Sequence, residues 1–136
     1  MKRAPLALAA ALLLAAAAPA SAQTFLTGDE VAKMLAGNTA TGSQTTPSGT
    51  KTDFTIYLTA DGKMKIRSVT KSLSQNTTRS GEWQVFSGQF CYHSSRDIMW
   101  NCNKFQRLAD DRIAMTDGMS PLRLELTIRT GNAAKL

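Results

Sequence analysis

Alternation of apolar and polar residues constrains the fold of this chain more than any other feature. Runs of this kind cover residues 54–58, 63–67 and 122–129. A period of two places successive side chains on opposite faces of a β-strand, so each run predicts a half-buried strand. Each run has a single apolar face, whereas strands of parallel sheets are buried on both faces. The pattern therefore predicts an antiparallel sheet.

One short helix is predicted ahead of the strands, at residues 28–36. Thr27 and Glu30 have the spacing of a capping box, and apolar residues recur at i, i+3 and i+4 from Val31. Gly37 follows as the residue that ends the helix. A helix this short is not stable alone, so it must dock on the sheet.

The remaining segments are short and separated by turns. Residues 38–52 are rich in Thr, Ser and Gly and predict a loop or a weak edge strand, and residues 72–80 form a second polar stretch. Further strands are predicted around residues 83–85, 90–92, 98–102 or slightly later, and 113–115, with Tyr92 opposite Trp83 across a Ser87-Gly88 turn. This spacing predicts a mainly β fold, a small antiparallel barrel or sandwich with one short N-terminal helix.

The register of one hairpin follows from its side chains. A two-residue Asp61-Gly62 turn would set Leu58 opposite Lys65 and so mix the two faces. A three-residue loop at 60–62 sets Leu58 opposite Met64, which keeps both apolar faces together. We therefore predict the three-residue loop, with its glycine in the left-handed conformation.

This register places three basic residues on the outer face of the hairpin. Lys63, Lys65 and Arg67 share that face, with Tyr57 across from Lys65. Basic side chains beside an aromatic ring can bind an anion or a glycan, so these four residues are our candidate contact surface. The alternative is a solvated sheet face whose charges prevent edge association.

Residues 1–22 have the pattern of a secretory signal peptide. Lys2 and Arg3 precede an uncharged run at 6–18, and Ala20-Ser21-Ala22 forms a cleavage site. The apolar run is shorter than a membrane span. We therefore predict a periplasmic or secreted protein with one β domain at residues 23–136 and no transmembrane segment after processing. Cleavage lowers the net charge of +6 by two, a mildly basic balance that fits an anionic envelope surface and gives no reason to expect nucleic acid.

Cys91 and Cys102 are the two cysteines of the chain. An even number in an exported protein predicts a disulfide, here closing a loop of about 12 residues worth on the order of 3 kcal/mol. Their spacing does not match the C-x-x-C of redox or zinc motifs, so a reactive thiol or a metal site is the lesser alternative.

The sequence offers little for catalysis. His93 is the single histidine, and no G-x-S-x-G motif supplies a nucleophile for it. Asp110 and Asp111 are adjacent and would point to opposite faces of a strand, unlike a catalytic pair. We therefore predict no catalytic residue, no metal site and no cofactor. Trp83 and Trp100 are predicted to anchor the core.

Several short motifs occur together in one order. They are the Asp61-Gly62 hairpin, Gly81-Glu82-Trp83, Phe90-Cys91-Tyr92 and Cys102, after a helix at 26–35 and Gly37-Asn38-Thr39. Over about residues 25–108 the chain resembles a family of small exported bacterial proteins of unknown function. The resemblance implies a compact β domain and a paired Cys91 and Cys102. It carries over no functional residue, because the family has no assigned activity.

Two functions from different classes fit these observations. The first is a non-enzymatic periplasmic β domain that binds a small ligand or an envelope component. The second is an inhibitor or immunity-type protein that blocks an exported enzyme with a loop such as residues 42–51. An enzyme is the third class. A stoichiometric protein partner recovered from periplasm would distinguish the second from the first.

Overall fold

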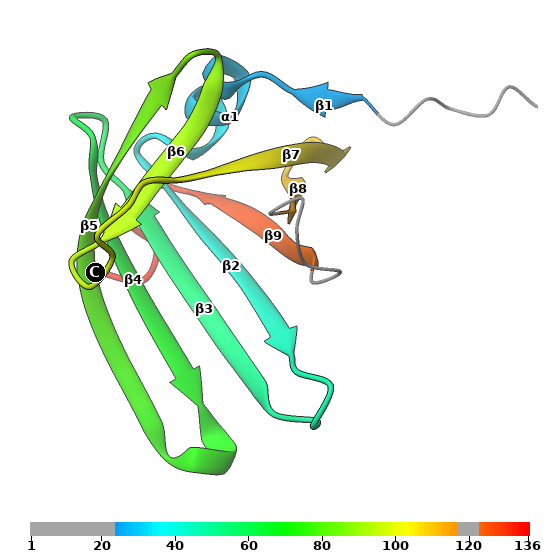
Figure 1. Cartoon of the computed structure of the whole chain (residues 1–136), viewed down its shortest axis with the longest axis vertical. Helices are drawn as coiled ribbons and strands as arrows, with labels where there is room; N and C mark the ends of the chain where they lie inside the picture. The colour runs from blue at the N-terminus through cyan, green and yellow to red at the C-terminus, as the bar shows by residue number, and fades with distance from the viewer. Residues whose placement is uncertain (1–23, 117–122) are drawn as a thin grey trace, which may run out of the picture.

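The computed structural model describes residues 24–116 and 123–136, and these residues form an antiparallel barrel with one helix (Figure 1). The predicted signal peptide, the Asp117-Gly118 turn and Leu122 lie outside the described residues. In chain order the elements are β1 (Phe25–Leu26), α1 (Gly28–Leu35), β2 (Asn38–Thr45), β3 (Lys51–Leu58), β4 (Lys63–Thr70), the 3-10 turn η1 (Lys71–Leu73), β5 (Gln75–Phe86), β6 (Gln89–Ser94), β7 (Asn101–Ala109), β8 (Arg112–Thr116) and β9 (Arg123–Thr130).

Closure of the sheet decides between the two predicted architectures. Each strand from β2 to β9 pairs antiparallel with the next, and β9 pairs back with β2. In the described part of the chain this gives a closed barrel of eight strands, with β1 added beside β7. The mainly β, antiparallel prediction is confirmed, and the form is a barrel rather than a sandwich.

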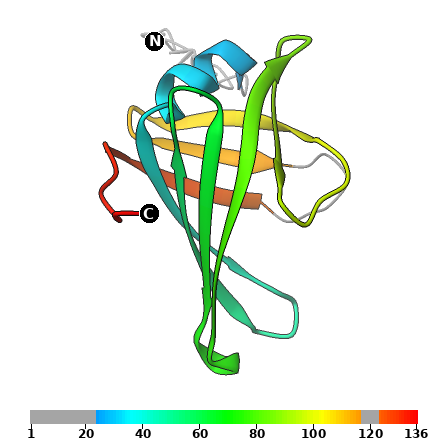
Figure 2. The same ribbon diagram turned by 90° about the vertical axis from the view of Figure 1, so that its left-hand side faces the viewer.

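The N-terminal helix forms as predicted and covers one end of the barrel (Figure 2). Both hydrogen bonds of the Thr27–Glu30 capping box are present. Gly37 follows the helix with a positive φ of 75°. Val31 and Leu35 are buried in the hydrophobic core. The helix is therefore held by packing of its apolar stripe, as its short length requires.

Residues 38–45 of the Thr- and Gly-rich segment form a central strand, which corrects the prediction of a loop or an edge for this part, whereas residues 46–50 form the turn to β3. β2 pairs with β3 on one side and with β9 on the other. A Cβ added at Gly42 would lie 2.4 Å from the carbonyl oxygen of Glu125, so β9 approaches too closely there for a side chain. Small residues make this contact possible, and closure of the barrel supplies the second partner.

Two predicted registers are confirmed. In the β3–β4 hairpin Leu58 pairs with Met64 and Tyr57 with Lys65, and the glycine of the 60–62 loop has a φ of 90°. In the β5–β6 hairpin Trp83 pairs with Tyr92. The apolar partners of both hairpins therefore face the barrel interior together.

The structure refines three further predictions. The strand predicted at 98–102 or slightly later takes the later position and begins at Asn101, and Ile98 and Met99 are exposed in the turn before it. Trp100 is 38% exposed at the surface rather than anchoring the core, whereas Trp83 packs against the core cluster as predicted. The polar stretch at 72–80 lies mostly in β5, because its backbone pairs with β4 whatever its side chains are.

Candidate ligand-binding cavity

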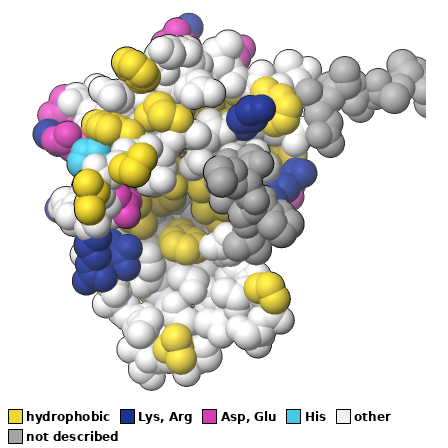
Figure 3. Space-filling model, in the orientation of Figure 1, with side chains coloured by type: hydrophobic (Ala, Val, Ile, Leu, Met, Phe, Trp, Pro, Cys, Tyr) yellow, Lys and Arg dark blue, Asp and Glu magenta, His cyan; other side chains and the backbone are white. Residues whose placement is uncertain are grey.

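A cavity of about 380 Å³ lies inside the barrel. Residues from all eight barrel strands and from α1 line it, which follows from the inward half of each alternating pattern. Its apolar wall includes the buried residues Leu58, Met64, Phe90, Phe105, Leu124 and Leu126. Figure 3 looks into the hollow, where hydrophobic side chains are visible behind the surrounding rim.

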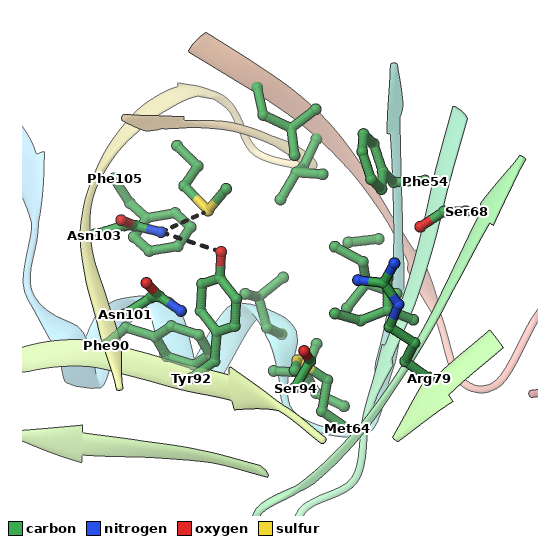
Figure 4. A pocket seen from close by; sticks show the side chains of 18 of the residues that line it. Phe54, Met64, Ser68, Arg79, Phe90, Tyr92, Ser94, Asn101, Asn103 and Phe105 are labelled. Atoms are coloured by element: carbon green, nitrogen blue, oxygen red, sulfur yellow. Dashed lines mark hydrogen bonds between the residues drawn. The ribbon is translucent and has the colours of Figure 1, made fainter. Parts of the chain in front are cut away.

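Arg79 brings a positive charge to this apolar cavity. It lies on β5 opposite Ile66, and both residues line the cavity. Its guanidinium points into the interior beside the Ser68 hydroxyl (Figure 4). The Nε atom is shielded from solvent and has no hydrogen-bond partner. Leaving a buried donor unpaired costs roughly 1–3 kcal/mol, and more when the group is charged.

A second polar group lies on the opposite wall, on β6 and β7 (Figure 4). Asn103 is 9% exposed, and its Nδ2 donates to the Tyr92 hydroxyl over 3.4 Å and to the Met115 sulfur over 3.2 Å. The distance to the hydroxyl is long for a hydrogen bond. The amide is therefore placed to face the cavity with weak internal partners.

Asp97 is the acidic residue of the lining in the described part of the chain, and it is engaged by its own loop. Its carboxylate accepts from the Ser94 backbone N–H at 3.1 Å and from the Ser94 hydroxyl at 2.9 Å. These two hydrogen bonds hold the pKa of Asp97 below its usual value, and the charge of Arg79 adds a smaller effect. No carboxylate among residues 24–116 and 123–136 forms an ion pair with Arg79.

A disulfide joins β6 and β7 on the outer side of the cavity wall. Cys91 on β6 and Cys102 on β7 are directly opposed, with their sulfur atoms 1.99 Å apart. The ladder between these strands has three residue pairs, and Tyr92 and Asn103 belong to the two pairs that flank the cysteines. The cross-link therefore lies where the polar wall of the cavity is held by the fewest backbone pairs.

His93 lies on the outer face of β6, between two inward-facing residues. Its Nε2 is 3.6 Å from a carboxylate oxygen of Glu82, and its ring meets Trp100 edge-on with centroids 4.4 Å apart. Asp110 and Asp111 lie in the β7–β8 turn. Within the described residues no three His, Cys, Asp or Glu side chains gather as a metal site would need.

The four residues of the candidate contact surface lie on the outer face, as the confirmed β3–β4 register requires. Lys63 Nζ is 2.6 Å from Glu82 Oε1. This contact raises the pKa of Lys63 and lowers that of Glu82. The charge of Lys63 is thus offset within the sheet, which leaves Lys65 and Arg67 with Tyr57 beside them.

Replacing Lys63, Lys65 and Arg67 together with Gln tests this surface. We expect the variant to keep its free energy of unfolding within about 0.5 kcal/mol per site, because substitutions on exposed sheet faces have small effects. We also expect unchanged sedimentation with anionic phosphatidylglycerol vesicles. Loss of vesicle binding that shrinks as salt rises would instead identify the surface as functional.

The sequence reasoning missed the cavity residues, and Arg79 most of all. The polar stretch at 72–80 has no alternation that predicts a strand, and therefore none that predicts an inward face. A signal was nevertheless present, because Trp83 was assigned to the inner face. Counting back in steps of two from Trp83 reaches Gly81 and then Arg79.

No family model matches the chain, and neither a curated protein nor a solved structure shows detectable similarity to it. The resemblance to small exported bacterial proteins therefore stays a prediction. No helix within the described residues has the length and apolar character needed to cross a membrane.

Proposed function

We propose that this protein is a non-enzymatic binding protein that holds one small, mainly apolar molecule inside its barrel. The observation that carries the proposal is the cavity of about 380 Å³ with a mainly apolar lining. Sites for small molecules measure about 300–1,000 Å³ and combine apolar walls with a few placed polar groups. Eight-stranded barrels have an interior of the size that holds one small ligand.

The energetics of the cavity favour an occupant. Side chains that line an empty space lose dispersion contacts on one side, because no atoms lie within contact range there. An apolar molecule of matching size restores those contacts and removes its own surface from water. The size of the cavity limits the occupant to a small molecule rather than a large polycyclic one.

The proposed setting is the periplasm or the medium, which rests on the signal peptide pattern at residues 1–22. Cysteines at disulfide distance are compatible with an oxidising compartment. A ligand taken from the cell envelope fits that setting, since envelope lipids and their fragments are apolar.

Filling the cavity tests the function. Ser68 lines the cavity from β4, so a Ser68→Trp side chain would occupy part of it. We expect the variant to bind N-phenyl-1-naphthylamine, a neutral probe that fluoresces in apolar surroundings, at least about 10-fold more weakly than the parent. Probe titration followed by fluorescence measures this.

Ser80→Trp is the matched control, because Ser80 lies on the outer face of neighbouring β5 and is exposed. It should leave probe affinity unchanged. If the parent does not bind the probe, or both variants bind as the parent does, the cavity is not a binding site. That result would favour the inhibitor function. Residues 42–51 would then act through the end of β2, a tight turn and the start of β3, rather than through the loop predicted.

A further inference from the structure

We propose that the ligand is an anionic amphiphile, with one oxyanion bound by Arg79 and an apolar body packed against the cavity wall. This inference rests on the proposed function and adds the chemical class of the ligand. It is carried by the inward-facing guanidinium, whose Nε has no partner, within a mainly apolar lining.

The first argument concerns charge. Arg79 is the one basic residue among the described residues that line the cavity, and Asp97 is the one acid. The Asp97 carboxylate is held by two hydrogen bonds from Ser94. A positive charge left without a carboxylate partner in apolar surroundings is unfavourable, and an incoming oxyanion would relieve that cost.

The second argument concerns shape. A guanidinium presents a planar fork of N–H donors that matches the two oxygens of a carboxylate or similar group. The Ser68 hydroxyl lies next to this fork and adds another donor (Figure 4). The head group would therefore sit at the β4–β5 wall, between Arg79 and Ser68.

The third argument concerns the rest of the molecule. Phe54 lies beside the same wall, and Phe90 and Phe105 lie across the cavity (Figure 4). On the far wall the Asn103 amide points toward the Tyr92 hydroxyl and the Met115 sulfur. Apart from Arg79 and the Asp97 carboxylate that Ser94 holds, the described lining carries no charge, so the body of the ligand is expected to be apolar and uncharged.

An arginine without a role in binding is expected on the outer face of the barrel rather than on the inner face. Arg67 lies on the neighbouring strand, one pair along the β4–β5 ladder, and faces outward, although Arg67 and Arg79 are both partly buried. The same strands thus place one arginine outside the barrel and one inside. On the inside, the Nε of Arg79 is shielded from water without a partner, which costs stability, and binding of an anion would explain this position.

The test compares decanoate with 1-decanol, which share a chain and differ in the charged head. At pH 8 each compound competes with N-phenyl-1-naphthylamine for the parent protein and for Arg79→Gln. We expect the parent to prefer decanoate by roughly 10- to 100-fold, as a charge-assisted pair contributes. Arg79→Gln should lose that preference and keep its affinity for 1-decanol within about twofold.

Two further variants complete the test. Arg79→Lys should keep part of the preference, because it retains the charge without the fork. Arg129→Gln, at an exposed position of β9 outside the cavity lining, should keep all of it. If the neutral probe binds but decanoate fails to displace it, or if both compounds compete equally, the anionic class is wrong while the binding function stands. Absence of probe binding to the parent would reject the function itself.

Discussion

Replacing Gly81 with Val is expected to lower the free energy of unfolding by about 3 kcal/mol, since overpacking costs this much when the neighbours cannot move. A Cβ at Gly81 would lie 2.2 Å from the carbonyl oxygen of His93 and 3.1 Å from the Cα of Ser94. Both are backbone atoms of β6, which pairs with β5 at this point. The strand would have to move away, which disturbs the ladder beside the cavity.

Urea denaturation followed by tryptophan fluorescence measures this effect. Ser80→Val is the control, because it adds the same side chain at the preceding residue, where the strand faces solvent. We expect Ser80→Val to change stability by less than about 0.5 kcal/mol. Equal stability of Gly81→Val and the parent would show that β5 and β6 are not packed as closely as described.

The double variant Cys91→Ala/Cys102→Ala is expected to lose about 2–4 kcal/mol of stability. The cross-link limits the conformations of the unfolded chain, and its loss restores them. Alanine is chosen because Cys91 is almost fully buried, and a serine hydroxyl there would add a separate burial cost. The loss should also weaken probe binding, because the pair joins the two strands that carry Tyr92 and Asn103.

Urea denaturation of the parent and the double variant, each with and without a phosphine reductant, measures how much stability the disulfide contributes. The parent should fall to the stability of the double variant when reduced, and the double variant should not respond. If reduction makes two thiols of the parent reactive but leaves its free energy of unfolding unchanged, the disulfide does not stabilise the protein. Unchanged probe binding in the double variant would show that the cavity does not need the disulfide in order to bind the probe.

Much of the cavity wall follows from local patterns, whereas its charged member does not. Leu58, Met64 and Leu124 were placed on inner faces by alternation, and the cavity lies between such faces. Arg79 belongs to a run of polar residues with no periodicity of its own, so this run does not indicate that the strand of Trp83 extends back to it. Pairing with Ile66 shows that the strand does extend to Arg79 and that Arg79 lies on its inner face.

The sequence by itself determined the helix with its capping box, the hairpin register around residues 60–62, and the antiparallel character of the sheet. Each of these depends on contacts between residues near one another in the chain, whose spacing records the period of the element. Tertiary structure alone decided that β2 is a central strand, that the sheet closes, and that Arg79 faces a cavity. Closure joins β2 to β9 across most of the chain length. Such pairing depends on backbone hydrogen bonds and close approach, as at Gly42, and these leave no periodic trace in the side chains.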